Sequence, residues 1–286
     1  MQRQLAKNRT ALTEAGVAYL PLEPFRSFFT SRLKKLTPGK FNIDDHSEKF
    51  FTDGKRRKIE RLLISDENLA GWCGSMLSTG VPFKGGVERL ERLRQLFPEA
   101  QITLFCSVRS YESFLTSAYC EILRHRPVFV DFRHFWDRVD FELLRWPSVL
   151  DSFVGVLRPT EIKLWRYEEF RSNSSDILRN LAFGTALPKL AEDQAHYASF
   201  SQLTMELLEC IAAAKGGKIA SSVLKGIDDS LPKAKGYAPF DPWSNLERSY
   251  LAERYKEDCK SIDPSRWLIA PTYASLEAKS AVGATS

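Results

Sequence analysis

Arg109 and Ser117 are the residues whose types and spacing point most directly to chemistry. Arg109 follows the apolar run 101–108 and precedes a helical pattern over 111–125, so a permanent cation is expected where a strand ends and a helix begins. The free N–H groups and the positive dipole end of such a helix favour an anion. Ser117 lies about 12 Å further along this helix, so both side chains could contact one phosphate. The same spacing also fits an arginine that pairs with a carboxylate and a serine that faces solvent.

The elements that must position these groups are read from the hydrophobic pattern. Apolar runs predict strands over 17–20, 61–65, 101–108 and 161–167. Helical patterns alternate with them over 2–15, 87–96, 111–125, 147–157 and 174–183, and a last helix is expected over 245–262. The alternation predicts an α/β fold with a parallel, doubly wound sheet. Ligands of such sheets bind beyond the carboxyl ends of the strands, so we expect the functional groups in 65–68, at Arg109 and its helix, and in 167–169.

Several segments of the sequence are similar to one known family. The segment SVRSYESFLTSAYCEIL, which contains Arg109 and Ser117, resembles the 3′-phosphate-binding segment of the sulfotransferases that use 3′-phosphoadenosine 5′-phosphosulfate. LLISDENLAG resembles the second conserved strand and turn of the bacterial branch of this family, and IKLWRYEEF resembles its later strand. YAPFDPW followed by ERSYLAERYKED resembles its C-terminal loop and helix. The resemblance spans residues 1–262 and rests on the order and spacing of these segments together.

The resemblance implies a fold, a reaction and binding residues. The fold would be a three-layer parallel sheet of the P-loop NTPase-like sulfotransferase type with a helical C-terminal part. The reaction would transfer a sulfuryl group from 3′-phosphoadenosine 5′-phosphosulfate, a co-substrate, to a hydroxyl of a carbohydrate or small metabolite. Arg109 and Ser117 would bind the 3′-phosphate of the donor. Lys233 and Lys235 would close over the nucleotide from the C-terminal loop, and a solvated loop is the alternative.

Such a transfer needs a group that takes the proton of the attacking hydroxyl. Glu67 is the first candidate because it follows the strand 61–65 at the expected ligand edge. Asp66 is the second candidate and His46 the third. The alternative role for Glu67 is that of an acid at the start of a helix, where the helix dipole favours it.

One motif of the family has no counterpart in this sequence. The family's donor loop, a Lys-[Ser/Thr]-Gly-[Thr/Ser]-[Thr/Ser] turn after the first strand, binds the 5′-phosphosulfate. Residues 2–20 resemble the segment on the C-terminal side of that loop, so the resemblance predicts that the first strand and the loop precede Met1 in a longer protein. The alternative is a sulfotransferase-like domain that binds a nucleotide or a protein partner without turnover.

The composition bounds the class of protein. The chain has 286 residues, of which 43% are hydrophobic and 27% charged, with a net charge of +5. We expect one α/β domain over 1–270 and a disordered tail over 271–286. The small positive charge suits an anionic ligand rather than a nucleic acid.

No apolar run reaches the roughly 18 residues of a membrane helix, so we expect a cytoplasmic protein without membrane insertion. The scattered histidines do not have the spacing of a metal site, so we expect no metal.

Overall fold

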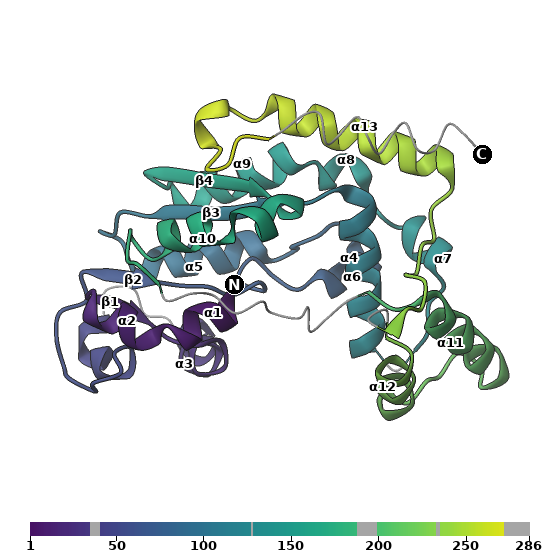
Figure 1. The fold of residues 1–286 in the computed structure, drawn as a ribbon, viewed down its shortest axis with the longest axis horizontal. Coiled ribbons are helices and arrows are strands. Elements are labelled where there is room, and N and C mark those ends of the chain that lie inside the picture. The colour runs from purple at the N-terminus through teal and green to yellow at the C-terminus, as the bar shows by residue number, and fades with distance from the viewer. Residues whose placement is uncertain (35–40, 127, 188–198, 233–234, 272–286) are drawn as a thin grey trace.

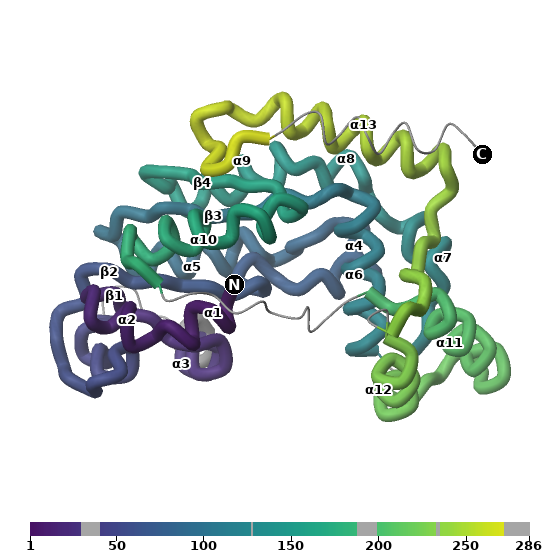
Figure 2. The backbone as a smooth tube through the Cα atoms, in the orientation of Figure 1, coloured from purple at the N-terminus to yellow at the C-terminus, as the bar shows by residue number. Residues whose placement is uncertain are grey.

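The computed structural model describes residues 1–34, 41–126, 128–187, 199–232 and 235–271. Within these residues the protein has a mixed α/β fold (Figures 1 and 2). Its strands are β1 Val17–Tyr19, β2 Arg61–Leu63, β3 Thr103–Val108 and β4 Glu161–Arg166. Its α-helices are α1 Gln2–Lys7, α2 Arg9–Glu14, α3 Leu22–Lys34, α4 Met76–Thr79, α5 Gly86–Leu96, α6 Tyr111–His125, α7 Phe132–Trp136, α8 Phe141–Leu144, α9 Trp146–Leu157, α10 Phe170–Leu181, α11 Gln202–Ala214, α12 Ser221–Ser230 and α13 Asn245–Ser261. Short 3-10 helices are η1 Ile43–Lys49, η2 Cys73–Ser75, η3 Tyr167–Glu169 and η5 Pro264–Arg266.

The strands form where the sequence predicts them, but they pair in two separate sets. β1 pairs in parallel with β2, with Val17 opposite Arg61. β3 pairs in parallel with β4, with Thr103 opposite Glu161. The α/β class and the parallel pairing are therefore confirmed. A single continuous sheet is not formed by the described strands, because β2 and β3 are not hydrogen-bonded to each other.

Helices cover both faces of each strand pair. On one face, Leu63, Phe105 and Trp165 belong to a cluster, here called the α10 cluster, with further side chains of α1, α2, β1 and α10. On the opposite face of β1–β2, Ala18 and Leu62 pack with aromatic residues of α3 and with the end of α5, here called the α3 cluster. This alternation along each strand follows from the opposite directions of successive side chains in a strand.

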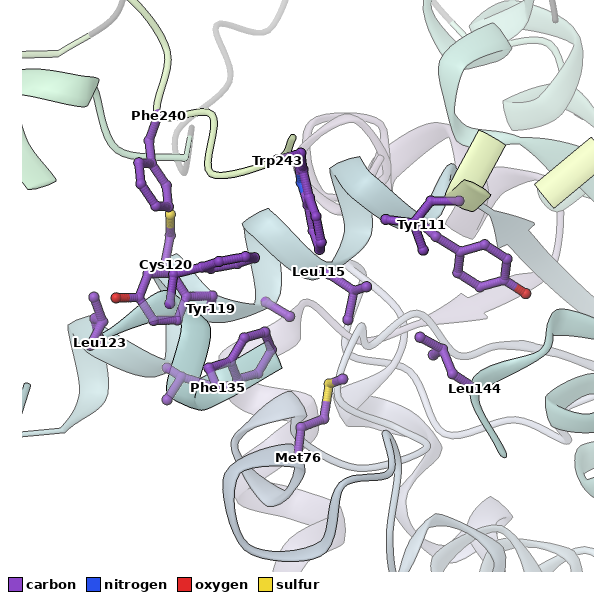
Figure 3. Close-up of a cluster of buried hydrophobic side chains, with 14 of the residues drawn as sticks. Met76, Tyr111, Leu115, Tyr119, Cys120, Leu123, Phe135, Leu144, Phe240 and Trp243 are labelled. Carbon is purple, nitrogen blue, oxygen red and sulfur yellow. The ribbon is translucent and has the colours of Figure 1, made fainter. Parts of the chain in front are cut away.

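The largest cluster lies around α6 and covers the other face of β3–β4. Figure 3 shows Tyr111, Leu115 and Tyr119 of α6 within this cluster, with Met76 and Phe135 nearby. All of these side chains are fully buried. The helix α6 is therefore held in a fixed position beside the carboxyl end of β3, where Arg109 lies.

The helix predicted over 2–15 is interrupted in the structure. Asn8 lies between α1 and α2 with a φ of −99° and a ψ of 16°. Its side chain donates a hydrogen bond from Nδ2 to the carbonyl oxygen of Gln4, at 2.8 Å. An asparagine side chain that bonds to the backbone competes with the helical hydrogen bonds, and this explains the break.

Candidate functional site

Arg109 is the first residue after β3, as the sequence predicts. Its guanidinium group lies over the ring of Tyr167, 4.4 Å from Cζ to the ring centroid. Its Nε donates a hydrogen bond to Oγ of Ser113, at 2.8 Å. Its carbonyl oxygen accepts a hydrogen bond from Nε1 of Trp146, at 2.8 Å. No ion pair with a carboxylate is found for Arg109 in the described part of the chain, so its positive charge is oriented by neutral groups.

Ser113, which the sequence interpretation missed, is the direct partner of Arg109 on α6. It lies one helical turn before Ser117, on the same face of the helix, and both serines are half-buried. No hydrogen bond of the Ser117 hydroxyl is found among the described residues. A four-residue spacing from Arg109 was the available signal for Ser113. Tyr167 belongs to the segment 167–169 after β4, which the sequence predicts at the same ligand edge, but its direct contact with Arg109 was not predicted.

The start of α6 already has one anionic partner. The backbone N–H of Ser110 donates to Oε1 of Glu168, at 2.9 Å, and the hydroxyl of Tyr255 donates to Oε2 of the same carboxylate, at 3.1 Å. Glu168 therefore stabilises the positive end of the helix dipole. The N–H group of Ser110 is therefore occupied, and the arginine and the serine hydroxyls are the side-chain groups that a ligand phosphate near Arg109 would use.

A buried carboxylate holds the surrounding helices together. Asp258 of α13 is 1% exposed. Its Oδ1 accepts a hydrogen bond from Nε of Arg145, at 2.6 Å, and its Oδ2 accepts one from the backbone N–H of Trp146, at 2.9 Å. The hydroxyl of Tyr111 also donates to Oδ2. Burial and the neighbouring Asp258 carboxylate raise the pKa of Tyr111 far above its usual value, so the phenol remains a hydrogen-bond donor. This network joins α13 and α9 to the first residue of α6.

The two carboxylates after β2 have different environments. Nε and Nη2 of Arg26 donate to the two oxygens of Asp66, at 3.1 and 2.7 Å, and the Asp66 side chain is 7% exposed. Nη2 of Arg26 also reaches Oε1 of Glu67 at 3.3 Å, but the Glu67 side chain is 63% exposed. Glu67 is therefore accessible to a substrate, whereas Asp66 is engaged in a paired contact. Within the described residues, no hydrogen bond or ion pair connects either carboxylate with Arg109.

The remaining predicted site residues are not gathered around Arg109 by any described contact. The ring of His46 packs against those of Phe28 and Phe41, with centroid distances of 5.3 and 6.0 Å, beside the α3 cluster. Lys235 is exposed in the loop before α13. Lys233 lies outside the described residues. Among the described residues, no group of three or more histidine, cysteine or acidic side chains is arranged to hold a metal ion.

A cavity of about 270 Å³ lies at the opposite end of β3 and β4, lined by Thr103, Phe105, Glu161, Lys163, Arg179 and neighbouring residues. Its lysine is paired with a carboxylate: Nζ of Lys163 is 3.2 Å from an oxygen of Glu161. The amino ends of parallel strands are not where such sheets bind ligands. Arg109, which has no carboxylate partner among the described residues, is therefore the better candidate for an anion site, although the cavity lies at the opposite end of the strands.

The comparisons with known proteins leave the family open. No protein-family model matches the chain, and no curated protein or solved structure matches it. None of the helices in the described part of the chain combines the length and apolar character needed to cross a membrane.

Proposed function

We propose that the protein is sulfotransferase-like and binds 3′-phosphoadenosine 5′-phosphosulfate at the carboxyl ends of β3 and β4. The observation that carries the proposal is the guanidinium group of Arg109, which is oriented by Ser113 and Tyr167 and has no described carboxylate partner. A phosphate that meets an oriented guanidinium gains charge-assisted hydrogen bonds of about 1.5–3 kcal/mol each. The 3′-phosphate of the donor is the group that we assign to Arg109 and Ser117.

The proposed reaction transfers a sulfuryl group to a hydroxyl of a carbohydrate or small metabolite. The acceptor oxygen forms a bond to sulfur, and the bond between sulfur and the 5′-phosphate oxygen breaks. The proton of the acceptor hydroxyl would pass to Glu67, whose carboxylate is exposed to solvent. Lys235, and Lys233 with it, would cover the nucleotide from the C-terminal loop. Rate enhancement would come mainly from positioning and charge neutralisation, as in phosphoryl transfer.

The proposed fold is a three-layer sheet of the P-loop-like type. It is supported by the parallel direction within both strand pairs and by the helices on both faces of each pair. Figure 1 is consistent with this layering, because α10 lies in front of β3 and α5 behind the strands.

A binding domain without turnover is the second candidate. Both candidates share the 3′-phosphate site, so binding tests that site and turnover separates the two functions.

Arg109→Ala is expected to weaken the binding of adenosine 3′,5′-bisphosphate by about 2 kcal/mol or more, which is roughly 30-fold in the dissociation constant. Ser117→Ala is expected to cost less, about 1 kcal/mol, because the donor that it removes is uncharged. Isothermal titration calorimetry measures both effects. Arg179→Ala is the matched control, since it removes one positive charge at the opposite end of the strands. Unchanged affinity in Arg109→Ala would contradict nucleotide binding by Arg109 and α6.

A further inference from the structure

The cavity at the amino ends of β3 and β4 lies between the strands and the end of α10. Its floor includes Phe105 of β3 and Lys163, the residue opposite it in β4, and its wall includes Arg179 and Phe183. The ring of Phe105 is half-buried, so the cavity has two phenyl rings among its lining groups. Its volume is about 270 Å³. This is enough for one substituted aromatic ring, because a cavity of about 150 Å³ holds a benzene molecule.

The charged groups of the cavity leave one guanidinium group without a strong partner. Nζ of Lys163 lies 3.2 Å from an oxygen of Glu161 and 3.4 Å from Oδ1 of Asn180, so the charge of this lysine is paired. Nη1 of Arg179 is 3.9 Å from an oxygen of Asp176, and the two side chains are 63% and 65% exposed. An ion pair that is so exposed contributes little. Arg179 is therefore the group of the cavity that an anion would bind.

Phe183 combines an exposed ring with an unfavourable backbone conformation. It lies two residues beyond α10, is 44% exposed and has a φ of +55°. The left-handed region disfavours residues that have a β-carbon, and glycine is the usual residue at this place after a helix. The N–H of Gly184 donates to the carbonyl oxygen of Arg179 at 2.8 Å, so the turn that holds Phe183 is closed by a hydrogen bond.

A second phenylalanine shows how such a conformation is normally compensated. Phe83 has a φ of +59°, and its ring packs against those of Phe114 and Phe153, with centroid distances of 6.3 and 5.9 Å. The ring of Phe183 instead has a guanidinium group above it, because Cζ of Arg61 lies 5.7 Å from its centroid. Packing therefore explains Phe83 but not the exposed ring of Phe183. Backbone strain that folding does not explain is often found where a side chain contacts a ligand.

We propose that the cavity at the end of α10 is a binding site for an aromatic carboxylate, separate from the site at Arg109. The ring of the ligand packs against Phe105 and Phe183, and its carboxylate accepts paired hydrogen bonds from the guanidinium of Arg179. Arg61 adds positive charge beside Phe183. The site lies against the face of the strands and not beyond their carboxyl ends, so we assign it binding and no chemistry. It does not depend on the proposed function.

Ligand-observed fluorine NMR with para-fluorobenzoate tests the site on the unmodified chain. We expect saturable binding with a dissociation constant of about 1 mM or lower, as is reasonable for so small a ligand. Two matched probes each lack one part of this ligand. Para-fluorobenzyl alcohol lacks the carboxylate and fluoroacetate lacks the ring, and we expect both to bind at least about 10-fold more weakly.

Variants separate binding from a structural role of the ring. Phe183→Gly is expected to weaken binding at least about 10-fold, and its midpoint of thermal unfolding is expected to be no lower than that of the unmodified protein, because glycine relieves the backbone. Phe83→Gly is expected to lower the midpoint, because its ring is packed. Tyr250→Ala is the control for binding, since this ring is 47% exposed and lies 5.6 Å from Cζ of Arg254. We expect its affinity to be unchanged.

Four results would overturn the proposal. The first is a lack of saturable binding of para-fluorobenzoate, or equal binding of para-fluorobenzyl alcohol. The second is unchanged affinity in Phe183→Gly. The third is a fall of the unfolding midpoint in Phe183→Gly as large as that in Phe83→Gly, because the ring would then serve packing. The fourth is displacement of para-fluorobenzoate by adenosine 3′,5′-bisphosphate, which would place the ligand at the other site. A failure to bind the bisphosphate would count against the proposed function alone.

Discussion

Asp258→Ala is expected to lower the free energy of unfolding by about 3–5 kcal/mol, the cost of removing one partner from a buried ion pair. Asp258 is 1% exposed and accepts hydrogen bonds from Arg145, Tyr111 and Trp146. Its removal leaves the hydroxyl of Tyr111 and the N–H of Trp146 without their acceptor in a buried site, and it leaves the charge of Arg145 without its closest partner. Such a loss is a large part of the stability of an ordinary domain.

Urea unfolding followed by circular dichroism measures this loss. Asp151→Ala is the matched control, because its side chain is 72% exposed and lies 3.8 Å from Arg266. We expect this variant to change stability by less than about 0.5 kcal/mol, as is usual for surface positions. If the two variants lost equal stability, the network around Asp258 would not be what holds α13 against α6 and α9.

Glu67→Gln is expected to lower turnover about 100-fold or more in a form of the protein that transfers sulfate, because a glutamine cannot take the proton of the acceptor. The affinity for adenosine 3′,5′-bisphosphate is expected to stay nearly unchanged, since no described contact connects Glu67 with Arg109. A steady-state assay and calorimetry on the same variant separate these two effects.

Glu23→Gln is the control for the loss of a carboxylate near Arg26. Glu23 is 84% exposed and its Oε1 is 3.8 Å from Nη1 of Arg26, so this variant removes a charge beside the same arginine and leaves the proposed base intact. We expect normal turnover. Full activity of Glu67→Gln would move the proton acceptor to Asp66 or His46, or would show that no protein base is required.

The positions of the elements were largely predictable because they depend on local patterns. The helix predicted over 111–125 has the same bounds as α6, and the helix predicted over 87–96 differs from α5 by one residue. All four predicted strands form, although each is one or two residues shorter than its predicted run. Local patterns do not determine which strands become neighbours, and the separation into two pairs was therefore not predicted.

In the site, as in the fold, the sequence predicted local positions but not the contacts between distant segments. A residue directly after a buried strand must lie at the strand's carboxyl end, and this placed Arg109 correctly. Its contact with Tyr167 joins residues of different strand ends, and the hydrogen bond from Tyr111 to Asp258 joins residues 147 positions apart. Such contacts are set by the packing of distant segments, for which a single sequence gives no spacing rule.

The most direct test of the central claim, that Arg109 and α6 bind a 3′-phosphate, is a calorimetric comparison of adenosine 3′,5′-bisphosphate with adenosine 5′-phosphate. The two ligands differ only in the 3′-phosphate. We expect the bisphosphate to bind roughly 30-fold more tightly or better, which corresponds to about 2 kcal/mol from the charge-assisted contacts of Arg109. We also expect this preference to disappear in Arg109→Ala. Equal affinities of the unmodified protein for the two nucleotides would contradict a 3′-phosphate site at Arg109.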